Sequence, residues 1–367
     1  MKSRKLAASL IFVFGCALLS RGQIIGQDAR EVQDMSQFPS QVYIDVKKGW
    51  HPTGLNREEM ALMKSHMRER KLEGLQKFWY PQGSGTILSP TWILTAAHLF
   101  DNPKEVFTLS GIANRLPGFV GRDVRFVEKL DGVRVMAGQL RRNARSVWHR
   151  VEQVRIHHMY SRKGMGNDIA LLQLKEPLRL DSAQVGSLPL PQVDPANNLN
   201  MDCKIVGWGR HTMQSARDFR MRWANTHIVS RDPFSKFPEF SYQNDYLPVG
   251  TPLNPALKKF EPASTLPGDS GSGLICNYNG RDYVFGVAQG GRSLPDNMAE
   301  SYYGTEMVPS FYTNTFYHRD WIMRQMAMLA PAGSSQRNLI SAYHDLPPFD
   351  DEGNWNGREW VFSNSKP

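Results

Sequence analysis

Short apolar runs separated by turn residues fill the chain after residue 80. The runs are rich in Val, Ile, Leu and Thr, and Gly, Pro, Asn and Asp stand between them, which is the pattern of short strands. Because helices do not alternate with these strands, a parallel sheet is not expected. The pattern favours antiparallel barrels or sandwiches. The clearest runs are GTILSPTWILTAA (85–97), DVRFVEKL (123–130), VRVMAGQL (133–140), DIALLQL (168–174), CKIVGWG (203–209), ANTHIVS (224–230) and DYVFGVAQ (282–289).

Two segments instead have the spacing of amphipathic helices. In the first, at 56–79, Asn56 is a candidate N-cap with Glu59 three residues later. We expect this helix to pack against the rest of the protein with a face of methionines at helical spacing. Those methionines are Met60, Met63 and Met67. The second, at 318–330, has an apolar stripe that predicts a docking helix. The stripe consists of Trp321, Ile322, Met326 and Leu329.

The N-terminus has the layout of a secretory signal peptide. A basic start precedes an apolar run from Leu6 to Leu19, which is short for a bilayer span. Residues 1–23 are therefore assigned to a signal peptide with room for a short pro-segment, and a secreted, periplasmic or extracellular location is expected. No second run of spanning length follows, so no transmembrane span is expected after signal removal. An uncleaved anchor helix and lipidation at Cys16 are the alternatives.

The charge is moderately basic. The formal net charge of +9 falls by four, to +5, if the signal peptide leaves, because four basic residues and no acid go with it. Those four are Lys2, Arg4, Lys5 and Arg21. A further basic cluster is read as a solvated face, and contact with an anionic surface is the alternative. Its members are Arg134, Arg141, Arg142, Arg145 and Arg150. Nucleic acid is not an expected partner.

Three cysteines are present. Cys16 lies inside the signal peptide, which leaves Cys203 and Cys276. An even number of cysteines in an exported chain suggests one disulfide. Two buried free thiols are the alternative.

The residues that suggest chemistry are an acid and a hydroxyl side by side. In the stretch LPGDSGSGLIC (266–276), Asp269 and Ser270 stand between glycines. Alone, this also fits an ordinary turn. However, His98 follows an apolar strand and Asp168 begins another. Hydroxyl, imidazole and carboxylate are the three groups that nucleophilic acyl transfer needs.

Four motifs and their order carry a resemblance to a known family. They are TAAH ending at His98, NDIALL around Asp168, GWG at 207–209 and GDSG at 268–271. With these motifs the chain resembles the chymotrypsin family of serine proteases over roughly 24–329. The resemblance implies an all-β fold of two packed six-stranded antiparallel β-barrels with a C-terminal helix. It also implies that Cys203 and Cys276 pair.

The resemblance also implies a division into domains. The first barrel is expected at 24–190, with a helical insertion at 45–80 that exceeds what the family needs. We expect the insertion to pack beside the cleft and to restrict the primed side of the substrate. The second barrel and the C-terminal helix are expected at 191–330. Residues 331–367 form a C-terminal extension.

By the same resemblance, each motif residue has a role. Ser270 is the nucleophile, His98 takes its proton, and Asp168 orients the imidazole. The backbone N–H groups of Gly268 and Ser270 form the oxyanion hole. Asp269 is expected to pair with the new α-amino group of Ile24.

Two departures from the family pattern qualify these roles. Gln23 precedes Ile24, whereas family zymogens are usually cut after Arg or Lys at that point. In the specificity pocket, Ser264 stands where trypsin-like members carry an acid, and Ser310 replaces a usual glycine. With Thr265 and Gly291 as further lining residues, a neutral, somewhat narrowed pocket is expected.

The sequence therefore predicts an exported serine endopeptidase that works through an acyl-enzyme, without strong preference for Arg or Lys at P1. Its partner is a protein or peptide substrate, and neither a metal nor an organic cofactor is implied. The leading alternative is a catalytically silent homologue that binds partners. An esterase with the same triad and a binder of anionic matrix or membrane are further alternatives.

Overall fold

The computed structural model describes most of the chain between residues 29 and 328. The described ranges are 29–53, 56–59, 61–62, 65, 78–100, 107–108, 125–161, 166–195, 201–209, 219–231, 245–250, 265, 267–291 and 310–328. Within these ranges, no helix has both the length and the apolar composition needed to cross a bilayer.

The first sheet closes into an antiparallel barrel. Its strand order is β2-β3-β4-β8-β7-β6-β5, and β2 also pairs with β6, so that six strands form a ring and β5 extends it. These strands are β2 (Gln41–Thr53), β3 (Phe78–Ser89), β4 (Trp92–Thr95), β5 (Phe107–Thr108), β6 (Arg125–Ala137), β7 (His149–Ile156) and β8 (Ala170–Leu174).

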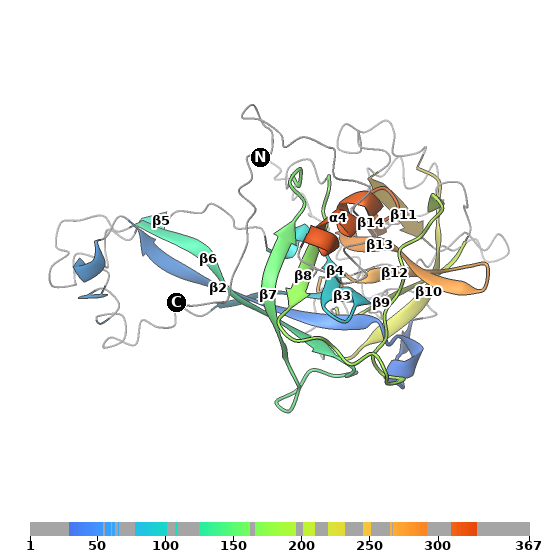
Figure 1. The fold of residues 1–367 in the computed structure, drawn as a ribbon, viewed down its shortest axis with the longest axis horizontal. Coiled ribbons are helices and arrows are strands. Elements are labelled where there is room, and N and C mark those ends of the chain that lie inside the picture. The colour runs from blue at the N-terminus through green and yellow to red at the C-terminus, as the bar shows by residue number, and fades with distance from the viewer. Residues whose placement is uncertain are drawn as a thin grey trace, which may run out of the picture.

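The second sheet closes in the same way. Its order is β1-β10-β11-β14-β13-β12-β9, and the additional pairing of β10 with β9 completes a ring of six strands. These strands are β1 (Arg30–Glu31), β9 (Asp202–Gly207), β10 (Arg222–Ile228), β11 (Tyr246–Gly250), β12 (Gly273–Tyr278), β13 (Arg281–Gly291) and β14 (Ser310–Asn314). The predicted fold of two six-stranded antiparallel barrels is confirmed, and Figure 1 shows them side by side.

An apolar cluster shared by both sheets joins the barrels. Tyr43 and Met136 of the first sheet and Val206 and Ile275 of the second are buried in it together with Trp208. The rings of Tyr43 and Trp208 lie 6.0 Å apart, edge to face. Burial of large aromatic rings stabilises such an interface strongly. The cluster therefore holds the two barrels in a fixed relation.

The C-terminal helix packs where its apolar stripe predicted. This helix, α4 (Arg319–Met328), follows the last strand of the second barrel. Ile322 nevertheless belongs to the core cluster of the first barrel, and Trp321 and Met326 pack partly buried against it. Leu329, the last predicted member of the stripe, lies outside the described residues. The helix thus fastens the end of the second barrel to the first.

The predicted disulfide is present. Cys203 and Cys276 are bonded, 73 residues apart in sequence, and they are opposite each other in the pairing of β9 with β12. In the chain-entropy model a crosslink over such a loop stabilises the fold by roughly 4 kcal/mol. The alternative of two free thiols is wrong.

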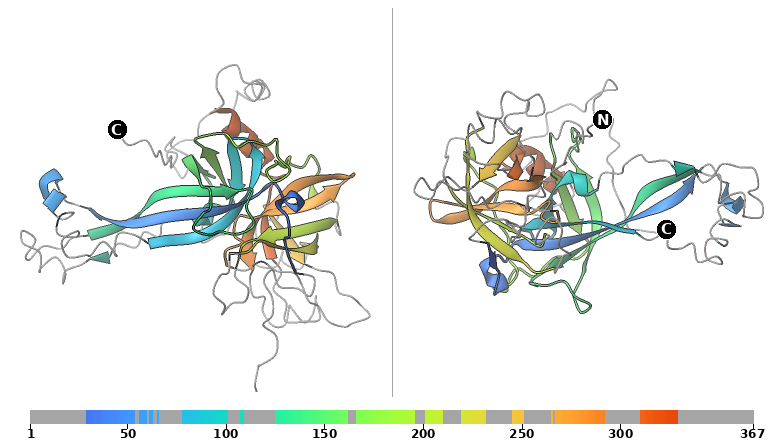
Figure 2. Two further views of the ribbon diagram at one scale, coloured as in Figure 1. Left: turned by 90° about the horizontal axis from the view of Figure 1, so that it is seen from below. Right: turned by 180° about the vertical axis from the view of Figure 1, so that it is seen from behind.

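The insertion at 45–80 contains strand as well as helix. β2 continues to Thr53 and β3 begins at Phe78. The paired ends of β2 and β6 extend beyond the first barrel as a ribbon (Figures 1 and 2). A helical turn at 57–59 begins with the predicted cap. Asn56 Oδ1 accepts from the Glu59 N–H, and a Glu59 carboxylate oxygen accepts from the Asn56 N–H, each at 2.9 Å, which is a capping box. The methionines Met60, Met63 and Met67 lie outside the described residues.

One strand prediction is wrong. The runs at 123–130 and 133–140 were expected as two strands because Asp131 and Gly132 are turn residues. The structure has a single strand, β6, in which Gly132 pairs with Lys47 and Leu130 pairs with Lys48. Asp131 is therefore skipped in the pairing, as in a β-bulge.

Two arginines of the predicted basic cluster bind a buried carboxylate. Asp45 in β2 is completely buried, and it lies 2.8 Å from Arg134 and 3.4 Å from Arg142. The Arg134 guanidinium also lies 3.8 Å from the centre of the Trp148 ring. Because Arg134 and Arg142 contact these neighbours, the predicted solvated face includes at most part of the basic cluster. Contact with an anionic surface stays the alternative to that face.

Candidate active site

A short helical turn presents His98 at the end of an apolar strand. β4 ends at Thr95, and a 3-10 turn (Ala97–Leu99) follows at once. Ala97 and Leu99 are buried on either side of His98, whose own side chain is 29% exposed. Burial of both neighbours anchors the backbone and leaves the imidazole accessible.

Asp168 holds His98 by two hydrogen bonds. Its Oδ1 accepts from the His98 backbone N–H at 2.8 Å, and its Oδ2 lies 2.7 Å from His98 Nδ1. The Asp168 side chain is only 6% exposed, so water competes little for these bonds. Because a carboxylate only accepts, the proton belongs on Nδ1. The imidazole is then left with Nε2 as its basic atom.

Ser270 occupies the second position of a tight turn. The Ser272 N–H donates to the Asp269 carbonyl at 2.9 Å, and Gly271 has a φ of 84°. Ser270 is not among the residues with positive φ, and a positive φ at the third position alone is typical of a type II turn and favours glycine there. Gly268, before the turn, has a φ of 110°. The glycines on both sides of Asp269 and Ser270 are therefore required by the backbone.

This turn packs against the segment that carries His98. The Ser270 carbonyl accepts from the Ser84 N–H at 2.8 Å. A Cβ on Gly83 would lie 2.8 Å from that carbonyl oxygen and 2.5 Å from the side chain of Leu99, the residue after His98. Gly83 therefore touches both segments. The turn that carries Ser270 and the segment that carries His98, far apart in sequence, therefore meet at Gly83.

The carboxylate of Asp269 explains the two glycines of the GWG motif. Asp269 is completely buried, and its Oδ1 accepts from the Gly209 N–H at 2.7 Å. A Cβ on Gly207 would lie 2.0 Å from Oδ1, and one on Gly209 would lie 2.4 Å from Oδ2. No larger residue fits at either position unless the carboxylate moves. Ile24, the predicted partner of Asp269, lies outside the described residues.

Three of the four predicted pocket residues are described, and two are bonded to each other. Ser310 Oγ accepts from the Thr265 N–H at 2.8 Å and lies 3.1 Å from Thr265 Oγ1. Both residues are buried. Gly291 pairs with Ser310 across β13 and β14, whereas Ser264 lies outside the described residues.

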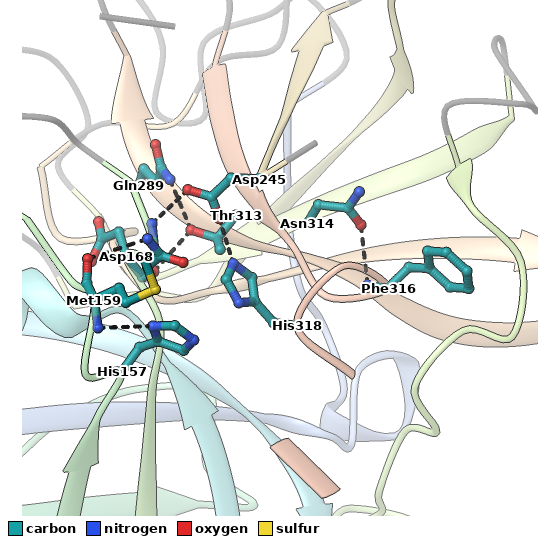
Figure 3. A network of polar contacts seen from close by, with 10 residues as sticks. His157, Met159, Asp168, Asp245, Gln289, Thr313, Asn314, Phe316 and His318 are labelled. Carbon is teal, nitrogen blue, oxygen red and sulfur yellow. Dashed lines mark hydrogen bonds and ion pairs between the residues drawn. The ribbon is translucent and has the colours of Figure 1, made fainter. Parts of the chain in front are cut away.

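A second layer of polar groups behind Asp168 was not predicted. Thr313 Oγ1 donates to the Asp168 carbonyl at 2.9 Å and lies 2.8 Å from Gln289 Nε2. Asp245 and His318 form a further buried pair beside it, as Figure 3 shows. No motif in the sequence singles these residues out, because their partners are set only by how the barrels pack.

Two closed six-stranded barrels, with a bonded histidine–aspartate pair in the first and a glycine-flanked serine turn of the second packed against it through Gly83, are the arrangement of trypsin-fold proteins. The comparisons agree with this class. The family model described as Trypsin matches residues 71–322. This match covers more than half of the chain, so the protein belongs to the Trypsin family.

A relative supports the same family. Coagulation factor XI of Bos taurus is 24% identical over 244 residues, which is 66% of this chain and 33% of that protein. The chain thus matches about a third of the relative's length.

Proposed function

We propose that this member of the Trypsin family is an exported serine endopeptidase. The observation that carries the proposal is the pair of hydrogen bonds that fixes His98 to a buried carboxylate beside the Ser270 turn. With the proton held on Nδ1 by Asp168, His98 Nε2 carries the lone pair that can act as a base toward Ser270. The signal-like N-terminus supports export.

In the proposed mechanism, Ser270 Oγ attacks the carbonyl carbon of the scissile peptide while His98 Nε2 takes its proton. The N–H groups of Gly268 and Ser270 stabilise the resulting oxyanion. The C–N bond then breaks, and His98 gives its proton to the leaving amine. Water, deprotonated by His98, attacks the ester, and His98 returns the proton to Ser270 Oγ as the bond between Oγ and the acyl carbon breaks. Asp168 holds the imidazole in the required tautomer throughout.

The proposed P1 preference is for small uncharged side chains. The hydroxyl of Ser310 stands where a glycine would leave the pocket open, and its bond to the Thr265 backbone fixes it there. Ser264 supplies no charge for Arg or Lys. A neutral pocket with an added side chain excludes large residues mainly by overlap.

We expect kcat/KM for a series of peptide amides to be highest with Ala or Val at P1. Ser310→Gly should raise kcat/KM for Phe at P1 by roughly 10-fold to 200-fold, because the pocket then accepts more apolar surface. The same substitution should leave the value for Ala within a few fold. Ser270→Ala, as the control, should abolish turnover. A preference for Arg, or no response to Ser310→Gly, would contradict the assigned pocket.

A catalytically silent homologue is the second candidate, favoured by one observation. Gln23 precedes Ile24, so cleavage after a basic residue does not generate the N-terminus that Asp269 is expected to bind. Under this candidate the same fold binds a partner and no amide is hydrolysed. Turnover of any amide substrate that Ser270→Ala abolishes decides against it.

A further inference from the structure

A second carboxylate and imidazole are buried together behind the proposed triad. Asp245 precedes β11 and His318 precedes α4, and their side chains are 3% and 2% exposed. Asp245 Oδ1 bonds His318 Nε2. Neither residue has a part in the bond-breaking steps. Figure 3 shows the pair beside Thr313 and Asp168.

Both oxygens of the Asp245 carboxylate are engaged. While Oδ1 bonds His318, Oδ2 accepts from the Asn167 backbone N–H at 2.5 Å. The Asp245 carbonyl accepts from the Asn314 N–H at 2.7 Å. A buried carboxylate is costly unless it is paired and hydrogen-bonded, so His318 is what allows Asp245 to sit here. The carboxylate in turn is what holds Asn167.

Asn167 is the residue immediately before Asp168, and its backbone has an uncommon conformation. Its φ of 55° lies in the left-handed region, which is uncommon for residues other than glycine and which asparagine adopts more readily than most. Asn167 Nδ2 donates to the Met159 carbonyl at 3.2 Å. Asp245 on the backbone and Met159 on the side chain therefore fix Asn167 from two directions. A rare conformation of this kind persists only where its surroundings hold it.

The bonds cross from one barrel to the other. His98 and Asp168 belong to the first barrel, whereas Asp245 and His318 belong to the second, which also carries Ser270. Release of the Asn167 N–H would let Asp168 shift relative to the serine. A buried pair of polar side chains loses its hydration on folding, so such a pair is in general a weak stabiliser compared with apolar side chains. A role in orientation explains this pair better than a role in stability.

We propose that Asp245 and His318 are positioning residues that fix the Asn167–Asp168 backbone against the barrel carrying Ser270. They thereby set the direction in which the Asp168 carboxylate meets His98. This inference rests on the proposed function, since the direction matters only if His98 acts as a base. Displacements of about 1 Å at such a distance from the chemistry can lower rates about 10²-fold.

The test compares Asp245→Ala with Asp45→Ala in the full chain. Asp45 is the matched control because it is also a buried carboxylate bonded to a basic side chain, but it lies in β2 away from Asp168. Active sites are counted by fluorophosphonate titration, so that loss of folded protein does not affect the rate per site. We expect Asp245→Ala to lower kcat per site on the order of 10-fold to 100-fold, with KM changed less than about threefold. Asp45→Ala should leave kcat per site unchanged.

Conservative variants separate positioning from folding. Asp245→Asn keeps an oxygen for the Asn167 N–H and offers an N–H to a neutral His318, so it should retain kcat within a few fold. If Asp245→Ala does not fold, the test compares His318→Gln with His318→Phe. We expect kcat to fall only in His318→Phe. The inference is overturned if kcat per site is unchanged in Asp245→Ala, or if Asp45→Ala loses as much.

A readout independent of turnover distinguishes failure of this inference from failure of the proposed function. If the wild-type chain neither cleaves amides nor reacts with fluorophosphonate, the proposed function fails. The positioning inference is then tested by NMR, through the far-downfield resonance of the proton in the hydrogen bond between His98 Nδ1 and Asp168. We expect it to shift or broaden in Asp245→Ala and not in Asp45→Ala. An unchanged resonance in Asp245→Ala overturns the inference.

Discussion

Replacing Asp168 by asparagine is expected to lower kcat/KM for a peptide amide about 10⁴-fold, which is the effect that the corresponding change has in the type enzyme of the chymotrypsin family. The amide oxygen can still accept from the His98 N–H, as Oδ1 does now. The amide NH₂ then faces His98 Nδ1, which must become an acceptor. The proton moves to Nε2, the atom that has to take the proton of Ser270.

The measurement is kcat/KM at pH 8 on a small-P1 amide, with Asp282→Asn as the control. Asp282 is an exposed aspartate that bonds Asn277 at the far end of the β12–β13 hairpin. It should keep wild-type activity. A loss of less than about tenfold in Asp168→Asn would show that Asp168 does not set the tautomer.

The second large effect is a loss of stability in acid that depends on His157. Burial is the main cause that lowers the pKa of His157 from 6.5 to about 2, and the charges of His318 and His158 add to it. Its Nδ1 accepts from the Met159 N–H at 3.3 Å, which also requires the neutral ring. The folded pKa lies below the unfolded value, so the stabilisation is complete above about pH 6.5 and is lost as pH falls toward 2.

Each pH unit in this window costs roughly 1.4 kcal/mol of unfolding free energy per proton. Between pH 7 and pH 5 the wild-type chain should therefore lose roughly 2 kcal/mol that His157→Phe does not lose. Urea unfolding at the two pH values measures the difference.

The control variant is His158→Phe. His158 stacks on His157, and burial lowers the pKa of both rings, but the larger shift is that of His157. His158→Phe should therefore reduce the loss of unfolding free energy between pH 7 and pH 5 by less than His157→Phe does. Equal pH dependence of the wild-type chain and His157→Phe would show that His157 is protonated in the folded state.

The sequence predicted those features whose cause is local. The alternation of apolar and polar residues predicted most strands, the Asn56–Glu59 spacing predicted a capping box, and an even cysteine count predicted the Cys203–Cys276 bond. Glycine next to Ser270 indicated a turn because positive φ is a property of the residue itself.

Features that depend on contacts between distant segments were not predicted. Asp131 and Gly132 have turn chemistry, but pairing with β2 along the whole of β6 made them a bulge instead. Arg134 was read as part of a solvated basic face because its partner, Asp45, is distant in sequence. Asp245 has no motif around it, and only the packing of the barrels brings it to Asn167.

Fluorophosphonate labelling of the full chain, with the modified peptide identified by mass spectrometry, tests the proposed peptidase site most directly. We predict one label per chain on Ser270, none on Ser270→Ala, and much slower labelling of His98→Ala, which lacks the base. Labelling of the wild-type chain at a different serine, or persistent labelling of Ser270→Ala, would contradict the assignment of Ser270 as the nucleophile.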